Sequence, residues 1–509
     1  MNRTPGQIDP TPQPAESAHT NGRQQPNAGP QLSDRRRLTI LAICCMSLLI
    51  VAMDNTIVNV ALPSIRRDLH ASVSGLQWTI DAYVIVLASL LLLSGSTADR
   101  LGRRRIFQLG LLVFVSASLL CSLAPSLGWL IAARALQGVG GSMLNPVAMS
   151  IITNVFTKPR ERARAIGAWG AVVGISLGLG PVVGGALTQT VGWRAIFWIN
   201  VPIGLAAVIL TALYVPESRA PRPRRIDPLG QVLVITALGS LTYAIIEGPR
   251  AGWSSAQTIG TFALSLLALA AIVFYEPRRR DPLIELRFFR SAPFSGATLI
   301  AISAFAGFSG FLLVNTLYLQ DVRGYSALQA GLSTLPMALA ALVCSPLSGR
   351  VLGRHGPRLP LFIAGSCMTA SALVLTTLTP STPLALLLAM YALFGVGFGW
   401  VNPPITYTAV SGMPNNQAGV AAAVASTSRQ VGQALGVAVI GSIIATAVDS
   451  GIGAQLASAS HPAWWLIAGC GVSVLAIGAV STGRWARRTA RQCAEGLEDE
   501  AAVAPLQPA

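Results

Sequence analysis

Charge is scarce in this chain of 509 residues, and lysine is almost absent. Only 11% of the residues are charged, 52% are hydrophobic, and Lys158 is the only lysine. This composition is too apolar for a set of ordinary soluble domains and indicates a protein embedded in a lipid bilayer. The net charge of +16 comes from short arginine clusters between apolar runs. That distribution is typical of membrane-topology signals and argues against nucleic acid as a partner.

Several kinds of catalytic and metal site are also missing from the sequence. The seven cysteines form no CxxC pair, and the four histidines lie in the N-terminal tail or in predicted loops. We therefore predict no disulfide framework, no metal site and no histidine-based catalytic triad. Because Lys158 lies in FTKPRER, there is no GxxxxGK[ST] phosphate-binding loop either. We expect a protein that is not an enzyme, has no cofactor and draws its energy from a gradient or from the substrate itself.

Fourteen apolar runs are each long enough to cross a bilayer, which takes about 20 residues. The arginine clusters alternate with these runs so that an even number of spans, with both termini in the cytoplasm, satisfies the positive-inside rule. The runs fall near residues 38–62, 76–97, 106–124, 127–152, 164–187, 195–214, 229–247, 258–275, 294–318, 330–349, 359–378, 384–409, 419–446 and 463–481, the thirteenth being the most polar.

An internal repeat divides the predicted spans into two groups of six around an inserted pair. The segment from Gly95 to Arg105 follows the second span, and a similar segment from Gly349 to Arg358 follows the tenth. Parallel repeats of this kind are a transporter architecture with the substrate site near the midplane. We predict an all-α integral membrane protein, irregular after Arg491, with the following parts: a disordered cytoplasmic tail (1–34), a six-helix bundle (35–215), a linker with two inserted spans (216–290), a second six-helix bundle (291–485) and a cytoplasmic tail (486–509).

The few charged side chains inside the predicted spans are candidates for proton coupling. A carboxylate at the bilayer centre costs several kcal/mol, so Asp54 and Asp81 should face water, a partner or a bound proton. Asp54 could instead cap or pack near a helix end, and Asp81 could form a buried pair with Arg134. Arg134 itself requires a carboxylate from the first or second span. Protonation of that acid would break the pair, which makes it a candidate proton switch, whereas Glu247 is interpreted as an interfacial residue.

The fifth predicted span is rich in glycine, with the sequence GAWGAVVGISLGLGPVVGGAL from Gly167 to Leu187. Each glycine costs a soluble helix about 0.5 to 1 kcal/mol relative to alanine. In hydrocarbon the helix persists because its backbone must stay hydrogen-bonded, and glycines four residues apart let neighbouring helices approach closely. Pro181 permits a bend. We therefore predict a packing and hinge helix.

The loop GSTADRLGRRR after the second span is a second predicted gating element. Asp99 can meet an arginine or a helix N-terminus there and hold one conformation closed. The remaining members of the element are Gly95, Arg100, Gly102 and Arg103.

Polar and aromatic residues in other spans are candidates for lining a substrate cavity. Arg429 occupies in the second bundle the position that Arg134 has in the first, although a structural role for it is equally open. The candidates are Trp78, Tyr83, Asn145, Phe305, Asn315, Tyr318, Asn402, Tyr407 and Arg429.

Taken in order, these motifs resemble those of the major facilitator superfamily, specifically its fourteen-helix drug:proton antiporters of the EmrB/QacA type. The resemblance runs from about Arg35 to Arg488 and includes WRAIFWINVPIG from Trp193 and YLQDVRGYSALQAGL from Tyr318. Four motifs carry it: Asp54, Thr56, Asn59, Ala61, Leu62 and Pro63 in the first span; Gly95 to Arg105; Arg134, Gln137 and Gly138; and the glycines of the fifth span with Pro181.

The resemblance implies proton-driven export by alternating access, with Asp54 and Arg134 in coupling roles. The resemblance also implies that the glycine-rich helix closes against the other half of the protein and prevents a proton leak. The gating residues that it implies are Gly174, Gly178, Gly180, Pro181, Gly184 and Gly185. We expect a monomer in a bacterial inner or plasma membrane, with protons, lipid and a small hydrophobic or amphipathic substrate as partners. An exporter dedicated to one metabolite or self-made antibiotic, and a channel or non-transporting receptor on the same fold, are the alternatives.

Overall fold

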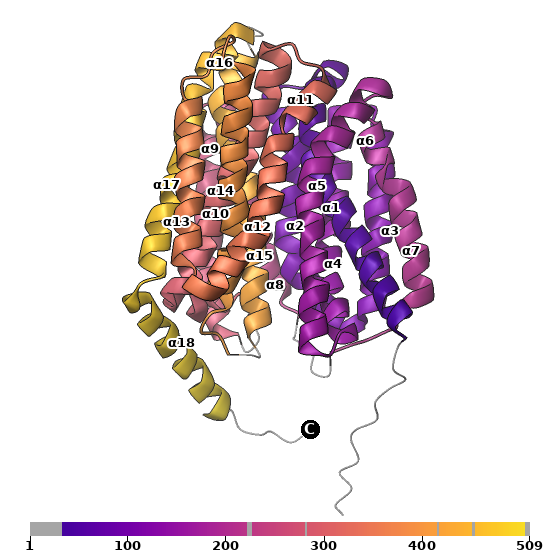
Figure 1. The fold of residues 1–509 in the computed structure, drawn as a ribbon, viewed down its shortest axis with the longest axis vertical. Coiled ribbons are helices and arrows are strands. Elements are labelled where there is room, and N and C mark those ends of the chain that lie inside the picture. The colour runs from indigo at the N-terminus through magenta and orange to yellow at the C-terminus, as the bar shows by residue number, and fades with distance from the viewer. Residues whose placement is uncertain (1–32, 221–225, 280–281, 415–416, 450–452, 504–509) are drawn as a thin grey trace, which may run out of the picture.

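A computed structural model describes residues 33–220, 226–279, 282–414, 417–449 and 453–503. Within these ranges the chain is helical and has no β-strand, so the predicted all-α class is confirmed, while residues 1–32 of the predicted tail lie outside them. Long helices run side by side between the two ends of the molecule (Figure 1). In order they are α1 (Asp34–Leu69), α2 (Val73–Leu101), α3 (Arg103–Ser122), α4 (Leu127–Val155), α5 (Pro159–Thr190), α6 (Ala195–Trp198), α7 (Asn200–Tyr214), α8 (Pro228–Ala251), α9 (Ala256–Tyr275), η1 (Glu276–Arg278), η2 (Leu286–Arg290), α10 (Ala292–Leu317), η3 (Tyr318–Val322), α11 (Ala327–Ser333), α12 (Leu335–His355), α13 (Arg358–Leu375), α14 (Leu384–Val410), α15 (Ala418–Asp449), α16 (Gly453–Ala459), α17 (His461–Ser481) and α18 (Arg484–Val503).

The ends of the helices follow the local sequence. Ser72, Ser126 and Asp227 each accept a hydrogen bond from a backbone N–H in the first turn of α2, α4 and α8. These side chains satisfy donors that the helix itself leaves free. Gly102 separates α2 from α3 with φ of 117°, a conformation that favours glycine.

Twelve helical segments of the described chain are long and apolar enough to cross a membrane. The predicted count of fourteen is not supported by this measure, because α4 and α15 are not among the twelve. Both helices are long, with 29 and 32 residues, but polar residues such as Arg134 in α4 and Arg429 in α15 lower their hydropathy. A further difference is that some predicted spans consist of two helices in succession, as in α6 with α7 and α11 with α12.

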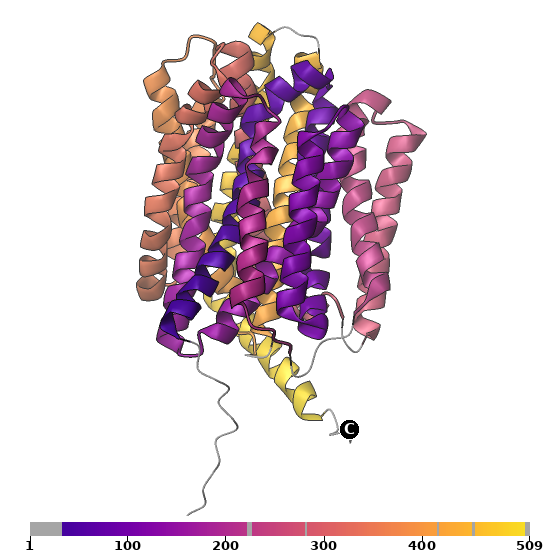
Figure 2. The same cartoon turned by 90° about the vertical axis from the view of Figure 1, so that its right-hand side faces the viewer.

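Two groups of helices lie side by side (Figure 1). Helices α1 to α7 pack on one another in the N-terminal group, and α10 to α17 do so in the C-terminal group. The groups meet along two seams, where α2 packs against α15 and where α5 packs against α11 and α12. The α8–α9 hairpin lies at one edge of the molecule (Figure 2), and α8 contacts both α2 and α15.

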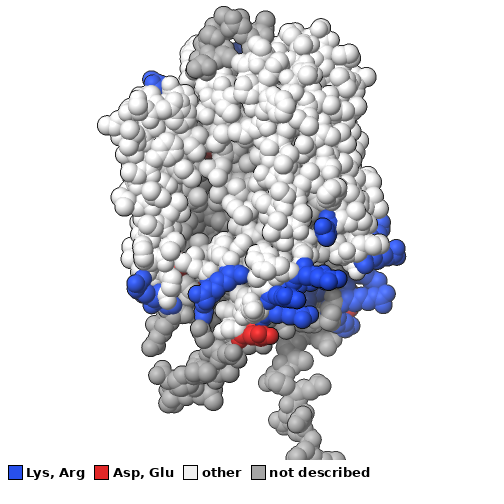
Figure 3. All heavy atoms as spheres, turned by 90° about the vertical axis from the view of Figure 1, so that its left-hand side faces the viewer, with Lys and Arg blue, Asp and Glu red and all other residues white. Residues whose placement is uncertain are grey.

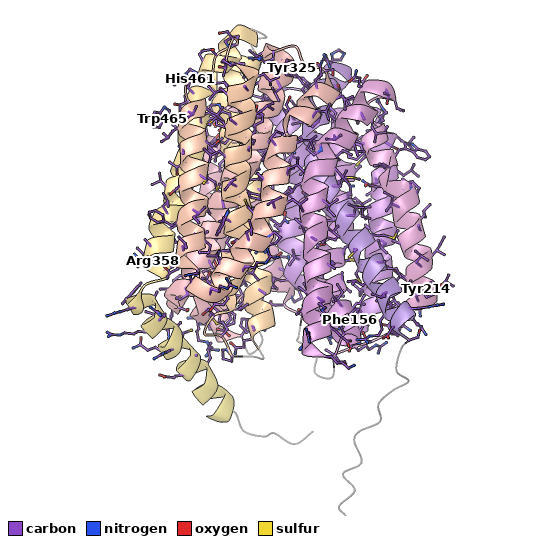
Figure 4. The ribbon with its side chains drawn as sticks, in the orientation of Figure 1. Phe156, Tyr214, Tyr325, Arg358, His461 and Trp465 are labelled. Atoms are coloured by element: carbon purple, nitrogen blue, oxygen red, sulfur yellow. The ribbon has the colours of Figure 1, made fainter. Side chains whose placement is uncertain are left out.

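The two ends of the molecule differ in charge. Lysine and arginine side chains gather in a band at the end from which α18 projects (Figure 3), and we call this the arginine-rich end. Phe156 and Arg358 lie at this end, whereas Tyr325 and His461 lie at the other, which we call the opposite end (Figure 4). Membrane proteins have this asymmetry when their basic loops share one side of the bilayer.

The C-terminal segment forms a helix where we expected irregular structure. The prediction after Arg491 is wrong as far as Val503, because α18 continues through it. Residues at helical spacing form one buried face of α18, among them Ala486, Ala490 and Leu497. This face packs against η2 and α10, and the burial of its apolar side chains stabilises the helix in an otherwise polar segment.

Candidate functional site

A buried ion pair joins α1 and α4 in the N-terminal group. Nη1 of Arg134 lies 2.5 Å from Oδ2 of Asp54, and the two side chains are only 1% and 0% exposed. The expectation that Arg134 pairs with a carboxylate from the first or second span is confirmed, and Asp54, not Asp81, is that partner. A guanidinium and a carboxylate this deeply buried tolerate each other only because they are paired and hydrogen-bonded.

A ring of neutral polar groups surrounds this pair. Gln137 donates from Nε2 to Oδ1 of Asp54 over 2.9 Å and to Oγ of Ser118 over 2.8 Å. Its own Oε1 accepts from Arg134 over 2.6 Å. Asn200, the first residue of α7, donates to the same Asp54 oxygen over 3.2 Å. Together these contacts tie α1, α3, α4 and α7 to one carboxylate.

Ser118 and Asn200 were not identified from the sequence. Asn200 is a polar residue in an otherwise apolar predicted span, which was the available signal. Ser118 offered none, because serine is common in buried helices.

The guanidinium of Arg134 also contacts α2 and two aromatic rings. Its Nε donates to the carbonyl oxygen of Thr79 over 3.0 Å. Its Cζ lies 4.3 Å from the ring centroid of Tyr83 and 5.7 Å from that of Phe197. These contacts stabilise the buried cation, which is only 1% exposed. Tyr83, predicted to line the cavity, thus lies beside the ion pair and is fully buried.

Asp81 is equally buried but has no partner. Both of its carboxyl oxygens lack a hydrogen bond in the described structure. Gln77 is one helical turn earlier on the same face of α2 and donates to the carbonyl oxygens of Val437 and Ala438 on α15 over 3.1 and 2.8 Å. Asp81 therefore lies on the face of α2 that is turned towards the C-terminal group.

The glycines of α5 form two contact surfaces. Gly180 and Gly184 face α1, where a Cβ added at Gly184 would lie 2.9 Å from the carbonyl oxygen of Ile57. Gly174, Gly178 and Gly185 face α12 and α11 of the C-terminal group. A Cβ added at Gly174 would meet Leu342, and one added at Gly178 would meet Ala338. A Cβ added at Gly185 would meet the main chain of Ala327. The predicted close approach of neighbouring helices is confirmed at these positions. One stripe of glycines thus faces α1, and the other faces the second helix group.

Contacts between the helix groups extend across the opposite end. A Cβ on Gly331 of α11 would press on the main chain at Pro181 of α5. Gln320 donates to the carbonyl oxygen of Val60 over 2.8 Å. Near the arginine-rich end of α5, Gly167 and Gly170 have nothing within 4 Å of an added Cβ. The two groups are therefore pressed together at the opposite end and not around these two glycines.

A polar pocket of about 500 Å³ lies beside this closed contact. It is bounded by the ends of α1 and α5, by η3 and by the start of α11. Its lining residues include Ser64, Arg67, Thr188, Gln320, Tyr325 and Gln329.

The predicted gating loop between α2 and α3 is held by two carboxylates. Asp99 accepts from Nε and Nη2 of Arg103 over 3.0 and 2.9 Å. Glu217, beyond α7, accepts from the backbone N–H of Arg104 over 3.1 Å and so caps the N-terminus of α3. A Cβ added at Gly102 would meet this Glu217 carboxylate. From the sequence, either an arginine or a helix N-terminus is a possible partner of Asp99. In the structure Asp99 binds Arg103, and Glu217 caps the N-terminus of α3.

The chain segment that follows Glu217 also docks on this loop. Arg103 donates its N–H to the carbonyl oxygen of Ser218, and Ala220 donates to that of Asp99. Gly95 lies in α2 near Pro146 of α4, and Arg100 is exposed.

The other predicted cavity residues lie in different surroundings. Trp78 is partly buried and donates from Nε1 to Oε1 of Glu247 over 2.9 Å. Asn315 is buried and accepts from the hydroxyl of Tyr391 over 2.5 Å, and Tyr318 donates to the carbonyl oxygen of Thr379 over 2.6 Å. Asn315 and Tyr318 are therefore part of the internal packing of the C-terminal group.

The remaining candidates are more accessible. Asn145 and Asn402 are partly buried, and Tyr407 is 48% exposed. Phe305 and Arg429 contact each other, with the guanidinium carbon 6.0 Å from the ring centroid.

Comparison with known proteins agrees with this architecture. The chain is 37% identical over 412 residues to the multidrug resistance protein Stp of Mycobacterium tuberculosis, covering 81% of this chain and 76% of that protein. It is 36% identical over 452 residues to the tetracenomycin C resistance and export protein of Streptomyces glaucescens, with 88% and 82% covered. It is also 38% identical over 423 residues to the puromycin resistance protein pur8 of Streptomyces alboniger, with 82% and 84% covered.

A solved structure shares the fold. A bacterial homologue of the human lysosomal transporter Spinster, in an inward-facing and occupied conformation, superposes with a TM-score of 0.63 at 19% identity, covering 90% of this chain and 98% of that one. The family model of the Major Facilitator Superfamily matches residues 44–437. This multi-pass membrane protein therefore belongs to the major facilitator superfamily of transporters.

Proposed function

We propose that this protein is a proton-coupled exporter of small amphipathic compounds that works by alternating access. The observation that carries the proposal is the pair of buried carboxyl groups in the N-terminal group. Asp54 is held by Arg134, and Asp81 has no hydrogen-bond partner in the part of the chain that the structure describes. Titratable groups in a membrane interior cost free energy, and a proton gradient acts on such groups.

Protonation of Asp54 is the coupling step in this proposal. A neutral carboxyl would lose most of its attraction to Arg134, which would keep Gln137, the Thr79 carbonyl and the Tyr83 ring. The contacts that tie α1 to α4 would weaken as a result. Asp81 would carry a proton at the α2–α15 seam, where a change in the distance between the groups alters its surroundings.

Alternating access uses the contacts at the opposite end. The described conformation is closed there by α5 against α11 and α12 and by η3 against α1. If the arginine-rich end faces the cytoplasm, as the positive-inside rule indicates, this is the state that loads substrate from the cytoplasm. Export then requires α5 to separate from α11 while the α2–α3 loop and the Glu217 segment close the other side.

We also propose that α4 and α15 cross the membrane, which restores fourteen spans and the EmrB/QacA type of the family. An α-helix of 29 residues is about 43 Å long, more than a bilayer requires. Both helices pack between spanning helices, α4 against α2 and α3, and α15 against α10 and α2. The proposed protein has two six-helix bundles, an inserted hairpin of α8 and α9, and both termini in the cytoplasm of a bacterial cell.

The substrate is proposed to be a small hydrophobic or amphipathic molecule. One relative is named for multidrug resistance, which supports a broad substrate range. Others are named for tetracenomycin C and for puromycin, which supports a second candidate, an exporter dedicated to one compound. Competition between unrelated compounds for transport separates the two candidates.

Proteoliposomes with an imposed pH gradient test the proposal, with puromycin and tetracenomycin C as the first probes. We expect gradient-driven transport by the wild type that a protonophore abolishes and that Asp54→Asn lowers by roughly two orders of magnitude. Asp68→Asn is the matched control, because Asp68 is 47% exposed and pairs with Arg194 at a helix end. Transport by Asp54→Asn at the wild-type rate, or transport that needs ATP, would show that the proposed coupling is wrong.

A further inference from the structure

Three helices of the C-terminal group bring one guanidinium and one aromatic cluster together. Arg429 of α15 donates from Nη2 to the hydroxyl of Thr406 on α14 over 2.5 Å and lies over the ring of Phe305 on α10. Phe305 continues into a cluster with Phe308 and Phe398, in which the rings of Phe308 and Phe398 stack with centroids 4.2 Å apart. Phe308 and Phe398 are buried and Phe305 is partly exposed, so the cation lies at the accessible edge of an aromatic cluster.

Arg429 has no acidic partner in the described structure. No carboxylate lies within 4 Å of it, and its buried Nε has no hydrogen-bond partner. The sequence explains why, because residues 291–448 contain a single acidic residue, Asp321. That residue lies in η3 at the opposite end and pairs there with Arg66. Arg134, by contrast, has its own carboxylate.

The unpaired guanidinium of Arg429 lies deep in the protein, where an anion would be a favourable partner. It lies about 17 Å along α15 from the arginine-rich end, counted as eleven residues of helix from Ala418. A charge at such a depth costs several kcal/mol unless it is solvated or paired. Arg429 is partly exposed and Thr406 is exposed, so an incoming ligand can reach the pair.

We propose that Arg429, Thr406 and the Phe305 cluster form a binding site for the acidic group of an aromatic amphipathic ligand. A carboxylate or an ionised phenol would accept hydrogen bonds from the guanidinium and from the Thr406 hydroxyl, in the planar geometry that arginine favours. The apolar body of the ligand would lie against Phe305, the partly exposed ring of the cluster, which the buried rings of Phe308 and Phe398 hold in place. This inference rests on the proposed export function, because it names the class of compound that the exporter carries.

The test compares two ligands that differ only in charge. Anthracene-9-carboxylic acid and anthracene-9-carboxamide have the same ring system, and their fluorescence reports binding to the full-length protein in lipid nanodiscs. Empty nanodiscs correct for partition into lipid. We expect the wild type to bind the acid roughly tenfold more tightly than the amide, since an ionic hydrogen bond is stronger than a neutral one.

Variants test whether the preference for the acid over the amide arises at Arg429 and Thr406. Arg429→Gln should weaken acid binding roughly tenfold and leave amide binding within about twofold, and Arg429→Lys should retain part of the preference. Arg350→Gln is the charge-matched control, because Arg350 is exposed on α12 near the arginine-rich end and should change neither ligand. Thr406→Val should weaken only the acid, by less than Arg429→Gln does.

Two results would overturn the inference. One is equal binding of acid and amide by the wild type. The other is an equal loss of both ligands in Arg429→Gln, which would mean that Arg429 maintains the structure through its contact with Thr406. Equilibrium binding needs no gradient, so failure of the proposed export, seen as no gradient-driven transport of either compound, is a separate result.

Discussion

Asp54 and Asp81 are equally buried, yet among the described residues a hydrogen-bonding partner exists for Asp54 and not for Asp81. Asp54 is bound to Arg134, Gln137 and Asn200, all within the N-terminal group. Asp81 has no hydrogen bond in the described structure and lies on the face of α2 that is turned towards α15. The first carboxyl is therefore part of one group's internal structure, and the second lies at the seam where the two groups meet. Their replacement should have different effects.

Asp54→Asn should lower the stability of the protein as well as its transport. The change leaves Arg134 buried without a counter-charge, which costs about 3 to 5 kcal/mol in comparable sites. The double variant Asp54→Asn/Arg134→Gln should be less destabilised than Asp54→Asn alone, because it removes the isolated charge. Thermal unfolding of the purified protein measures both, and additive effects of the two changes would contradict the coupling.

Asp81→Asn should leave stability unchanged to within about 1 kcal/mol, because no hydrogen bond is lost. It should nevertheless remove a proton from the transport cycle. A pH-sensitive dye can count protons released when substrate is added to the detergent-solubilised protein. Proton release equal to that of the wild type would exclude Asp81 as a coupling site, and Asp81→Glu should retain the release.

Alanine at Gly185 should open the seal at the opposite end. The added methyl would press on the main chain of Ala327, which cannot rotate away. A cysteine introduced by Ser64→Cys, in the polar pocket beside this seal, should then react several-fold faster with a membrane-impermeant maleimide. Gly167→Ala is the control on the same helix, since nothing lies within 4 Å of its added Cβ. Unchanged labelling in Gly185→Ala would mean that the α5–α11 contact is not the seal.

Glu217→Gln should loosen the loop between α2 and α3. The glutamine can still accept from the N–H of Arg104, but it loses the charge that favours a helix N-terminus, a loss of about 0.5 to 1 kcal/mol. Hydrogen exchange at the first turn of α3 should become several-fold faster. Asp34→Asn, which changes a 93% exposed carboxylate, serves as the control, and equal exchange in both variants would refute the assignment.

The buried ion pair could be predicted from the sequence because its energy is large. An arginine within an apolar span requires an acid, and only Asp54 and Asp81 were near enough in the expected topology. Asn200 and Glu217 could not be found in this way. Neutral amides and loop carboxylates are tolerated in many places, so their contacts with Asp54 and α3 depend on how distant segments pack.

Average hydropathy is a poor guide in two regions of this chain, the helices α4 and α15 and the C-terminal helix α18. The hydropathy of α4 and α15 is lowered by polar side chains that have partners on neighbouring helices, Arg134 with Asp54 and Arg429 with Thr406. The segment after Arg491 is polar in composition, yet α18 has a narrow apolar face that finds a partner in α10. Average composition does not show either arrangement. The helical spacing of the apolar residues along α18, however, can be recognised in the sequence.

The contact between Gly185 and the main chain of Ala327 has an energetic consequence. Apolar surface contributes about 25 cal/mol per Å², and a junction made of glycine and backbone buries little of it. Separating α5 from α11 therefore costs less than separating two helices joined by interlocking leucines. In the proposed alternating-access cycle, the two conformations would then differ by only a few kcal/mol, and a single bound proton or substrate would be enough to change which of them is populated.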